Sequence, residues 1–226
     1  MEKRRKWPQG AEGAREEPGC APAARGGGGG RAGDGAAHRM SPTQEVFNAL
    51  TMVPLACMAL HTLVRPAEGT TSADTLFAAA IIVHFPFSFC YHTHCALRHG
   101  LVDPVENNFF LKLDLVFIHI SGSLMALATS ASYAWFLAMA LFNAVSASRT
   151  LRWSNTTFER RSCRACCLLG YLLPVFAIDW VLFAWAMVVF GGMAFCFACN
   201  QQLRGWGHSL SHILLVPFAA CFFAAI

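Results

Sequence analysis

Two histidines stand four residues apart near the end of the chain, in the segment GWGHSLSHILL that contains His208 and His212. In a helix, this spacing puts both imidazoles on one face, one turn apart. Two imidazoles placed in this way can chelate a single metal ion. The pair alone is weak support for a metal site, because the chain has nine histidines and buried histidines often hydrogen-bond a neighbouring helix.

Two further segments carry polar residues that suit the same site. HFPFSFCYHTH places Ser88 and His92 four residues apart on one helical face, and LKLDLVFIH contains Asp114. A third imidazole from His92 would complete the three-ligand, one-water pattern of a catalytic zinc ion. Asp114 could then orient a ligand or take a proton from the bound water. Ser88 could hydrogen-bond that water or a developing oxyanion.

These residues fall at the ends of long apolar segments. The 226-residue chain is 55% hydrophobic and only 13% charged, which is too little polar surface to cover a soluble globule of this size. From residue 45 to the C-terminus, apolar runs alternate with short polar breaks, and each run is long enough to cross a bilayer. The sequence therefore predicts an all-α membrane protein, a bundle of seven transmembrane helices with an intramembrane zinc site.

We place the spans of this 44–226 domain at about 44–64, 75–97, 108–129, 132–148, 165–179, 180–200 and 205–226. The fifth and sixth are the hardest to separate, because only Asp179, beside Trp180, marks a turn between them. If they formed one bent helix, the chain would have six spans. Residues 1–40 are rich in Gly, Ala, Arg and Pro, and we expect them to form a disordered cytosolic tail.

Basic residues near the span ends predict the orientation, because Lys and Arg prefer the cytosolic side. With seven spans, the face that holds the N-terminus carries Arg98, Arg149, Arg152, Arg160, Arg161, Arg164 and Arg204, with Lys112 just inside it. The opposite face has Arg65 alone. We therefore expect the N-terminus and the basic loop RTLRWSNTTFERRSCR in the cytosol, and the C-terminus in a lumen or outside the cell.

This topology brings the three polar segments to one side of the membrane. The second span ends there, and the third and seventh spans begin there, so that His92, Asp114 and the 208–212 pair share the cytosolic leaflet. The sequon at Asn155 falls on the same side, where we expect no glycosylation.

Three other histidines lie deeper in their spans, and we expect each to form an interhelical hydrogen bond. They are His61, His84 and His119. His84 also lies on the face of Ser88 and His92, from which it could contact a substrate head group.

Three short segments carry a resemblance to a known family. They are SFCYH near the end of the second span, LD opening the third and HSLSH opening the seventh. Together they resemble the pattern of the CREST superfamily of seven-span membrane proteins. Its members include alkaline ceramidases, the progestin and adiponectin receptors with haemolysin III proteins, and lipases that remodel glycosylphosphatidylinositol anchors. The resemblance implies that His92, His208 and His212 bind zinc and that Asp114 and Ser88 are the associated catalytic pair. The stretch LDLVFIHISGSL looks most like the haemolysin III and adiponectin-receptor branch.

These features predict a zinc-dependent hydrolase, in which an activated water attacks an amide or ester carbonyl of a ceramide-like lipid or a phospholipid. Two alternatives remain open. One is a receptor or signalling protein in which zinc is structural and holds three helices in register. The other is a membrane scaffold whose histidines only pair helices. We expect a membrane lipid as the partner and no nucleic acid.

Overall fold

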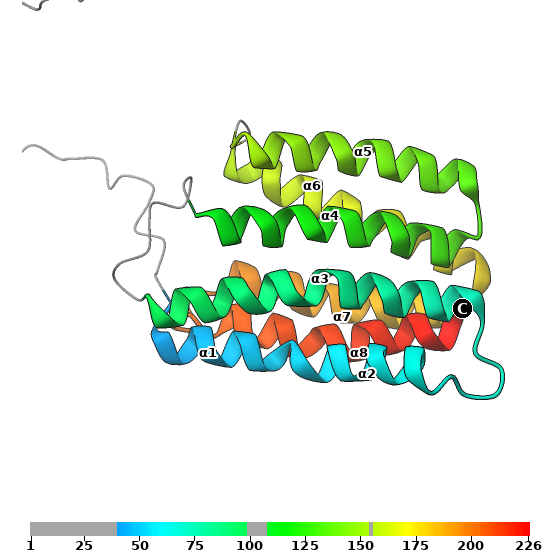
Figure 1. Cartoon of the computed structure of the whole chain (residues 1–226), viewed down its shortest axis with the longest axis horizontal. Helices are drawn as coiled ribbons and strands as arrows, with labels where there is room; N and C mark the ends of the chain where they lie inside the picture. Colours follow the sequence, from blue (N-terminus) through cyan, green and yellow to red (C-terminus); the bar gives the residue numbers. More distant parts are fainter. Residues whose placement is uncertain (1–39, 99–107, 154–155) are drawn as a thin grey trace, which may run out of the picture. The chain divides into compact units, whose positions relative to one another are not determined.

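Helices make up nearly all of the chain that the computed structural model describes, which is residues 40–98, 108–153 and 156–226. These residues contain no strand, as predicted for an all-α protein. Their helices, labelled as in Figure 1, are α1 (Pro42–Thr51), α2 (Val53–Val64), α3 (Ser72–Leu97), α4 (Phe109–Ser130), α5 (Tyr133–Leu151), α6 (Thr157–Ile178), α7 (Trp180–Ala198) and α8 (Gly207–Ala225). The predicted tail up to residue 39 and the sequon at Asn155 lie outside the described residues.

Six helical stretches in the described residues are long and apolar enough to cross a membrane. They are Pro42–Val64, Ser72–Leu97, Phe109–Ser130, Phe158–Ile178, Trp180–Ala198 and Gly207–Ala225. They correspond to six of the predicted spans and indicate a multi-pass membrane protein. The predicted fourth span, 132–148, is the helix α5, which does not belong to this set because Asn143, Ser146 and Arg149 reduce its mean hydropathy.

The first of these stretches joins α1 and α2, which are interrupted at Met52. Pro54 explains the interruption, because proline has no N–H to donate to the carbonyl of Leu50 and its ring crowds that carbonyl. A single crossing is thus built from two short helices, and α1 carries the polar residues that face the bundle interior.

Polar caps determine how the chain is divided around α6. Asp179 ends α6, and its side chain accepts hydrogen bonds from two N–H groups in the first turn of α7. The predicted turn at Asp179 is therefore confirmed. At the other end of α6, Thr156 and Glu159 form a capping box that starts the helix at Thr157. The prediction that this span begins near residue 165 was wrong, because much of the expected basic loop is helical.

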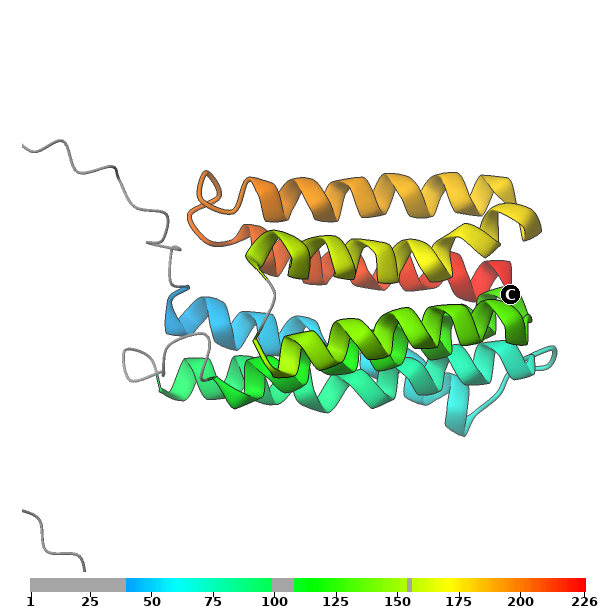
Figure 2. The same ribbon diagram turned by 90° about the horizontal axis from the view of Figure 1, so that it is seen from above.

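The arrangement of the helices brings distant segments together (Figures 1 and 2). α3 packs against α4 and against both α1 and α2, whereas α8 packs against α7 and α1. α1 contacts both α3 and α8, and the end of α3 lies close to the beginning of α8. α5 packs against α4 and α6.

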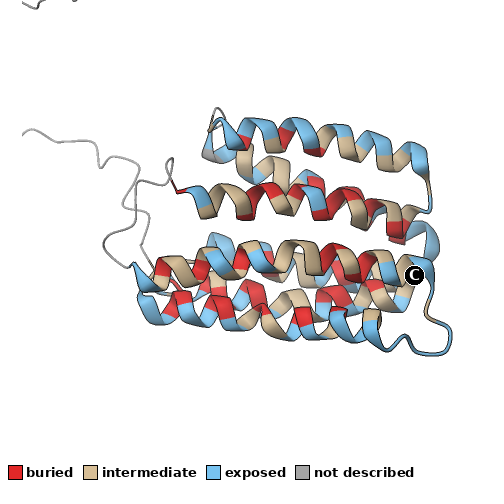
Figure 3. Ribbon diagram, viewed as in Figure 1, coloured by how far each residue is buried: buried red, intermediate tan, exposed pale blue. Residues whose placement is uncertain are grey.

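Buried residues line the inward sides of the helices (Figure 3). Away from the histidine-bearing ends, the core contains stacked aromatic rings, with the centroids of Phe77 and Phe222 5.0 Å apart. Large apolar side chains also remain exposed, including Trp180, Trp185 and Val188 on α7. Lipid can cover such an apolar surface, whereas exposure of the same surface to water would favour aggregation of the protein.

Candidate metal centre

Three imidazoles from α3 and α8 meet at one end of the helices. His92 lies near the end of α3, and His208 and His212 lie in the first two turns of α8. The side chain of Asn200 accepts a hydrogen bond from the backbone N–H of His208 and so satisfies one of the N–H groups that have no partner within the first turn of α8. Gly207 is required at the start of α8, because a Cβ there would overlap the Cys196 carbonyl oxygen.

The distances between the rings suit a metal ion. The Nε2 atoms of His92 and His208 are 3.4 Å apart, and one ring nitrogen from each of the three histidines lies within 4.8 Å of the others. Nitrogen ligands about 2.0–2.1 Å from a tetrahedral zinc ion lie about 3.3 Å from one another. The predicted cluster of His92, His208 and His212 is thus confirmed as a group that can hold a metal ion.

The outer nitrogens of two of these rings are bonded to oxygen acceptors. His92 Nδ1 lies 2.7 Å from Oε2 of Glu45, and His212 Nδ1 lies 3.4 Å from the backbone oxygen of Asn48. Since these oxygens accept hydrogen bonds, each Nδ1 carries the proton and each Nε2 presents a lone pair. Metal-binding histidines typically have such partners, which hold the ring orientation and its tautomer.

Glu45 was missed by the sequence reasoning. It lies in the first predicted span, where a carboxylate is costly unless it faces the bundle interior. That cost was the sequence signal that could have identified Glu45 as a site residue. In the structure it is only 5% exposed, and the His92 side chain that it contacts is 1% exposed. Glu45 therefore belongs to the site as the residue that positions His92.

α1 also positions α8 directly. The hydroxyl of Ser209 lies 2.5 Å from Oδ1 of Asn48, to which it donates a hydrogen bond. One helical turn earlier, the side-chain amide of Gln44 donates a hydrogen bond of 2.7 Å to the backbone oxygen of Arg204. These bonds hold the first turn of α8 against α1, so that the orientation of the imidazoles depends on three helices.

We expect Glu45→Gln to weaken zinc binding by about 10- to 100-fold, because the neutral amide holds His92 less firmly than the carboxylate does. Competition with a chromophoric zinc chelator, on the protein purified in detergent, measures the affinity. Glu68→Gln makes the same chemical change at an exposed position and should leave the affinity unchanged. Equal affinities for the two variants would show that Glu45 does not support the metal site.

Asp114 and Ser88 lie next to the histidines but interact with a different partner. Asp114, near the start of α4, is 3.0 Å from His84 Nε2 through its Oδ1 atom, and its carboxylate lies near the hydroxyl of Ser88. Both Asp114 and Ser88 are buried. The structure thus brings the predicted pair together, with His84 as a third member that orients the carboxylate.

The expected interhelical hydrogen bonds of the deeper histidines are confirmed in two cases. His84 bonds Asp114 across α3 and α4, and His119 Nδ1 lies 2.9 Å from the side-chain oxygen of Asn143 on α5. The Asn143 amide donates onward to the hydroxyl of Ser123. The prediction was wrong for His61, which is exposed on α2 because its helical face points away from the neighbouring helices.

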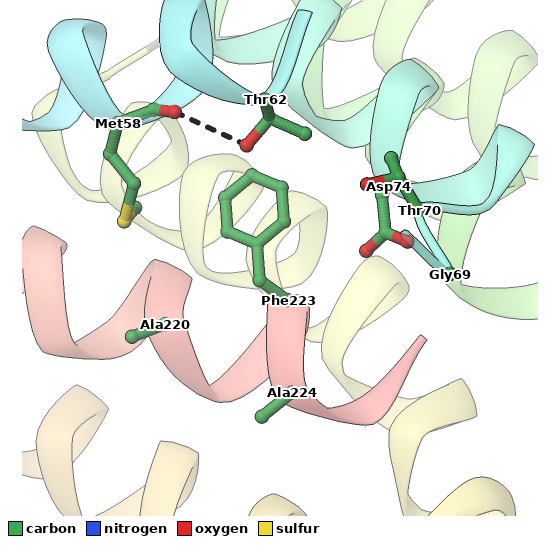
Figure 4. Close-up of a pocket in the computed structure, with 8 residues that line it drawn as sticks. All are labelled: Met58, Thr62, Gly69, Thr70, Asp74, Ala220, Phe223 and Ala224. Carbon is green, nitrogen blue, oxygen red and sulfur yellow. Dashed lines mark hydrogen bonds between the residues drawn. The ribbon is translucent and has the colours of Figure 1, made fainter. Parts of the chain in front are cut away.

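A cavity of about 490 Å³ at the other end of the helices offers no comparable chemistry (Figure 4). It is lined by Met58, Thr62, Phe223 and other residues of α2, α3 and α8, and Thr62 donates a hydrogen bond to the Met58 carbonyl. Asp74, its one ionisable lining residue among those described, accepts hydrogen bonds from the N–H and hydroxyl of Thr71. The histidine cluster is therefore the better candidate site.

No protein-family model, curated protein or solved structure matches this chain. A functional assignment consequently depends on the chemistry of the site itself.

Proposed function

We propose that the protein is a zinc-dependent hydrolase that cleaves an amide or ester bond of a membrane lipid. The observation that carries the proposal is the convergence of His92, His208 and His212, with the outer nitrogens of His92 and His212 bonded to oxygen acceptors. Three imidazole ligands leave one position open on a tetrahedral zinc ion, which is the arrangement of catalytic zinc sites. A structural site would more simply use four protein ligands.

A bound zinc ion would polarise the lipid carbonyl and make a water molecule nucleophilic at neutral pH. Residues of the chain would carry out the remaining steps. Asp114 would accept the proton that the attacking water loses and return it to the leaving group. His84 would hold the Asp114 carboxylate in place, and Ser88 would donate a hydrogen bond to the oxyanion that develops on the carbonyl.

The proposal includes a seven-helix bundle, in which α5 is the remaining crossing beside the six apolar stretches. The buried bond between His119 and Asn143 supports this arrangement, since it ties α5 to α4 with polar groups that are satisfied within the bundle. The N-terminus would then be cytosolic, and the C-terminus would be lumenal or extracellular. The histidines would lie in the cytosolic leaflet, just below the head groups of a ceramide-like or phospholipid substrate.

The resemblance to the CREST superfamily supports the same ligand set and the same catalytic pair. Within that superfamily, a receptor with a structural zinc ion is the alternative to a hydrolase. The burial of both Asp114 and Ser88 beside the histidines favours hydrolysis, because a structural site has no use for a proton acceptor next to its ligands.

Lipidomic analysis of membranes that contain the wild-type protein tests the proposal. We expect one lipid class to decrease and its deacylated product to increase in equal amount, relative to membranes without the protein. Removing zinc from the isolated membranes with a chelator should stop this conversion, and adding zinc back should restore it. If no pair of lipids changes in this reciprocal way, the protein is not a hydrolase.

A further inference from the structure

Arg164 stands out among the basic residues at this end of the molecule because it faces the bundle interior. It precedes Cys167 by three residues and Tyr171 by seven, so that all three share one face of α6. Cys167 is 1% exposed and contacts the Ile118 carbonyl on α4, and the ring of Tyr171 lies 5.5 Å from that of Phe222 on α8. The Arg164 face of α6 is therefore the face that packs against α4 and α8.

The guanidinium of Arg164 acts electrostatically on the site described above. Its charge interacts with Asp114 on α4, Tyr91 on α3 and His208 on α8. Arg164 is the eighth residue of α6, and His208 and His212 are the second and sixth residues of α8, which runs in the same direction. The arginine and the imidazoles thus lie within about two turns of the same end.

Two other arginines at this end have partners at the surface. Arg149 forms an ion pair with Glu159, and Arg160 lies over the ring of Trp153 at 4.0 Å. Within residues 40–98, 108–153 and 156–226, no carboxylate forms an ion pair with Arg164, because Asp114 is paired with His84 and Glu45 with His92. Arginine inside a membrane bundle is costly, and such residues are normally paired or used to bind a substrate.

We infer that Arg164 binds the phosphate of the lipid substrate, so that the protein acts on phosphate-bearing lipids and discriminates against neutral lipids such as ceramide. The inference rests on the proposed hydrolase function and narrows its substrate class. A planar guanidinium can donate two parallel hydrogen bonds to a phosphate, which makes arginine well suited to this role. The phosphate of a phospholipid lies at the membrane surface, a short distance above its ester carbonyls.

The test is a binding titration of the full-length, zinc-loaded protein in detergent, followed by native mass spectrometry. The probes are an ether-linked phosphatidate, which cannot be deacylated, the matching neutral dialkylglycerol, and palmitate as the carboxylate that hydrolysis would release. We expect wild type to bind the phosphatidate about tenfold or more tightly than the dialkylglycerol. Arg164→Gln should remove this preference, and Arg164→Lys should retain part of it because the charge is kept.

Arg161→Gln is the matched control, since Arg161 is exposed on the same helix and should leave the preference intact. Zinc content is measured on every sample, so that a damaged fold is recognised by loss of the metal. Equal binding of phosphatidate and dialkylglycerol by wild type would overturn the inference. The inference would also be wrong if Arg164→Gln still preferred phosphatidate over dialkylglycerol as wild type does. It would likewise be wrong if Arg164→Gln changed the binding of palmitate alone.

The two proposals fail in different ways. If wild type deacylates neutral lipids and Arg164→Gln does so equally well, the hydrolase remains and the phosphate assignment is wrong. If wild type deacylates no lipid but binds phosphatidate through Arg164, the hydrolase is wrong and the anion-binding role remains.

Discussion

The His212→Ala protein, purified in detergent, will contain no stoichiometric zinc, and membranes that contain it will show no lipid deacylation above background. His212 supplies one of three nitrogen ligands, and its Nδ1 is bonded to the Asn48 carbonyl, so that Nε2 presents a lone pair to the cluster. Losing a ligand costs more than losing its supporting hydrogen bond, which typically lowers metal affinity by about 10- to 100-fold. Zinc and turnover should therefore disappear together.

Two measurements on the same samples check this prediction, namely zinc by elemental analysis and lipids by mass spectrometry. His61→Ala is the matched control, because it removes an imidazole that is exposed on α2 and should leave both quantities unchanged. Unchanged deacylation in the His212→Ala protein would rule out zinc-dependent hydrolysis at this site. Absence of zinc from the wild-type protein would leave only the scaffold alternative, in which the histidines pair helices.

The Asp114→Asn protein should retain its zinc and lose about 10²- to 10⁴-fold in turnover, since it keeps the shape of the side chain but removes the proton acceptor. Asp114 is not among the three clustered ligands, and its contacts are with His84 and Ser88. The loss should fall on kcat more than on KM, because proton transfer matters in the transition state and not in lipid binding.

Steady-state kinetics with the lipid identified by lipidomics, together with zinc analysis, test this second prediction. Asp74→Asn is the control, because it makes the same chemical change in the capping box at the start of α3, whereas His92 lies near the end of that helix. It should leave turnover unchanged. If the protein is instead a receptor with structural zinc, Asp114→Asn should keep the metal, and neither the wild type nor this variant should deacylate any lipid. Loss of zinc in the Asp114→Asn protein would instead make Asp114 part of the metal support.

The sequence predicted the features that depend on short-range spacing. The pairing of His208 with His212 on one helical face follows from helical periodicity alone, as does the shared face of Ser88 and His92. The long apolar runs predicted membrane-spanning helices, and Asp179 marked the turn between α6 and α7 because a short carboxylate readily caps a helix.

The start of α6 was less predictable, since an apolar-run criterion places a span where the charged residues stop. A capping box at Thr156 and Glu159 extends the helix through those charged residues, because helix formation depends on backbone capping as well as on hydropathy. The apolar-run criterion also predicted a span at 132–148, whereas the corresponding helix α5 is not among the six stretches that are apolar enough to cross a membrane. Its buried Asn143 lowers the hydropathy of the helix, yet it is satisfied by His119 and Ser123.

The sequence by itself determined which residues share a helical face and which segments are apolar enough to enter a membrane. Only the tertiary structure decided which faces meet. His92 lies 116 residues from His208 and 47 from Glu45, and the spacing within each helix says nothing about these pairs. The packing of α1 against both α3 and α8 creates the carboxylate-supported histidine cluster, and the packing of α6 turns Arg164 towards it. Local periodicity orients a side chain on its own helix, whereas its partners depend on contacts between helices far apart in the chain.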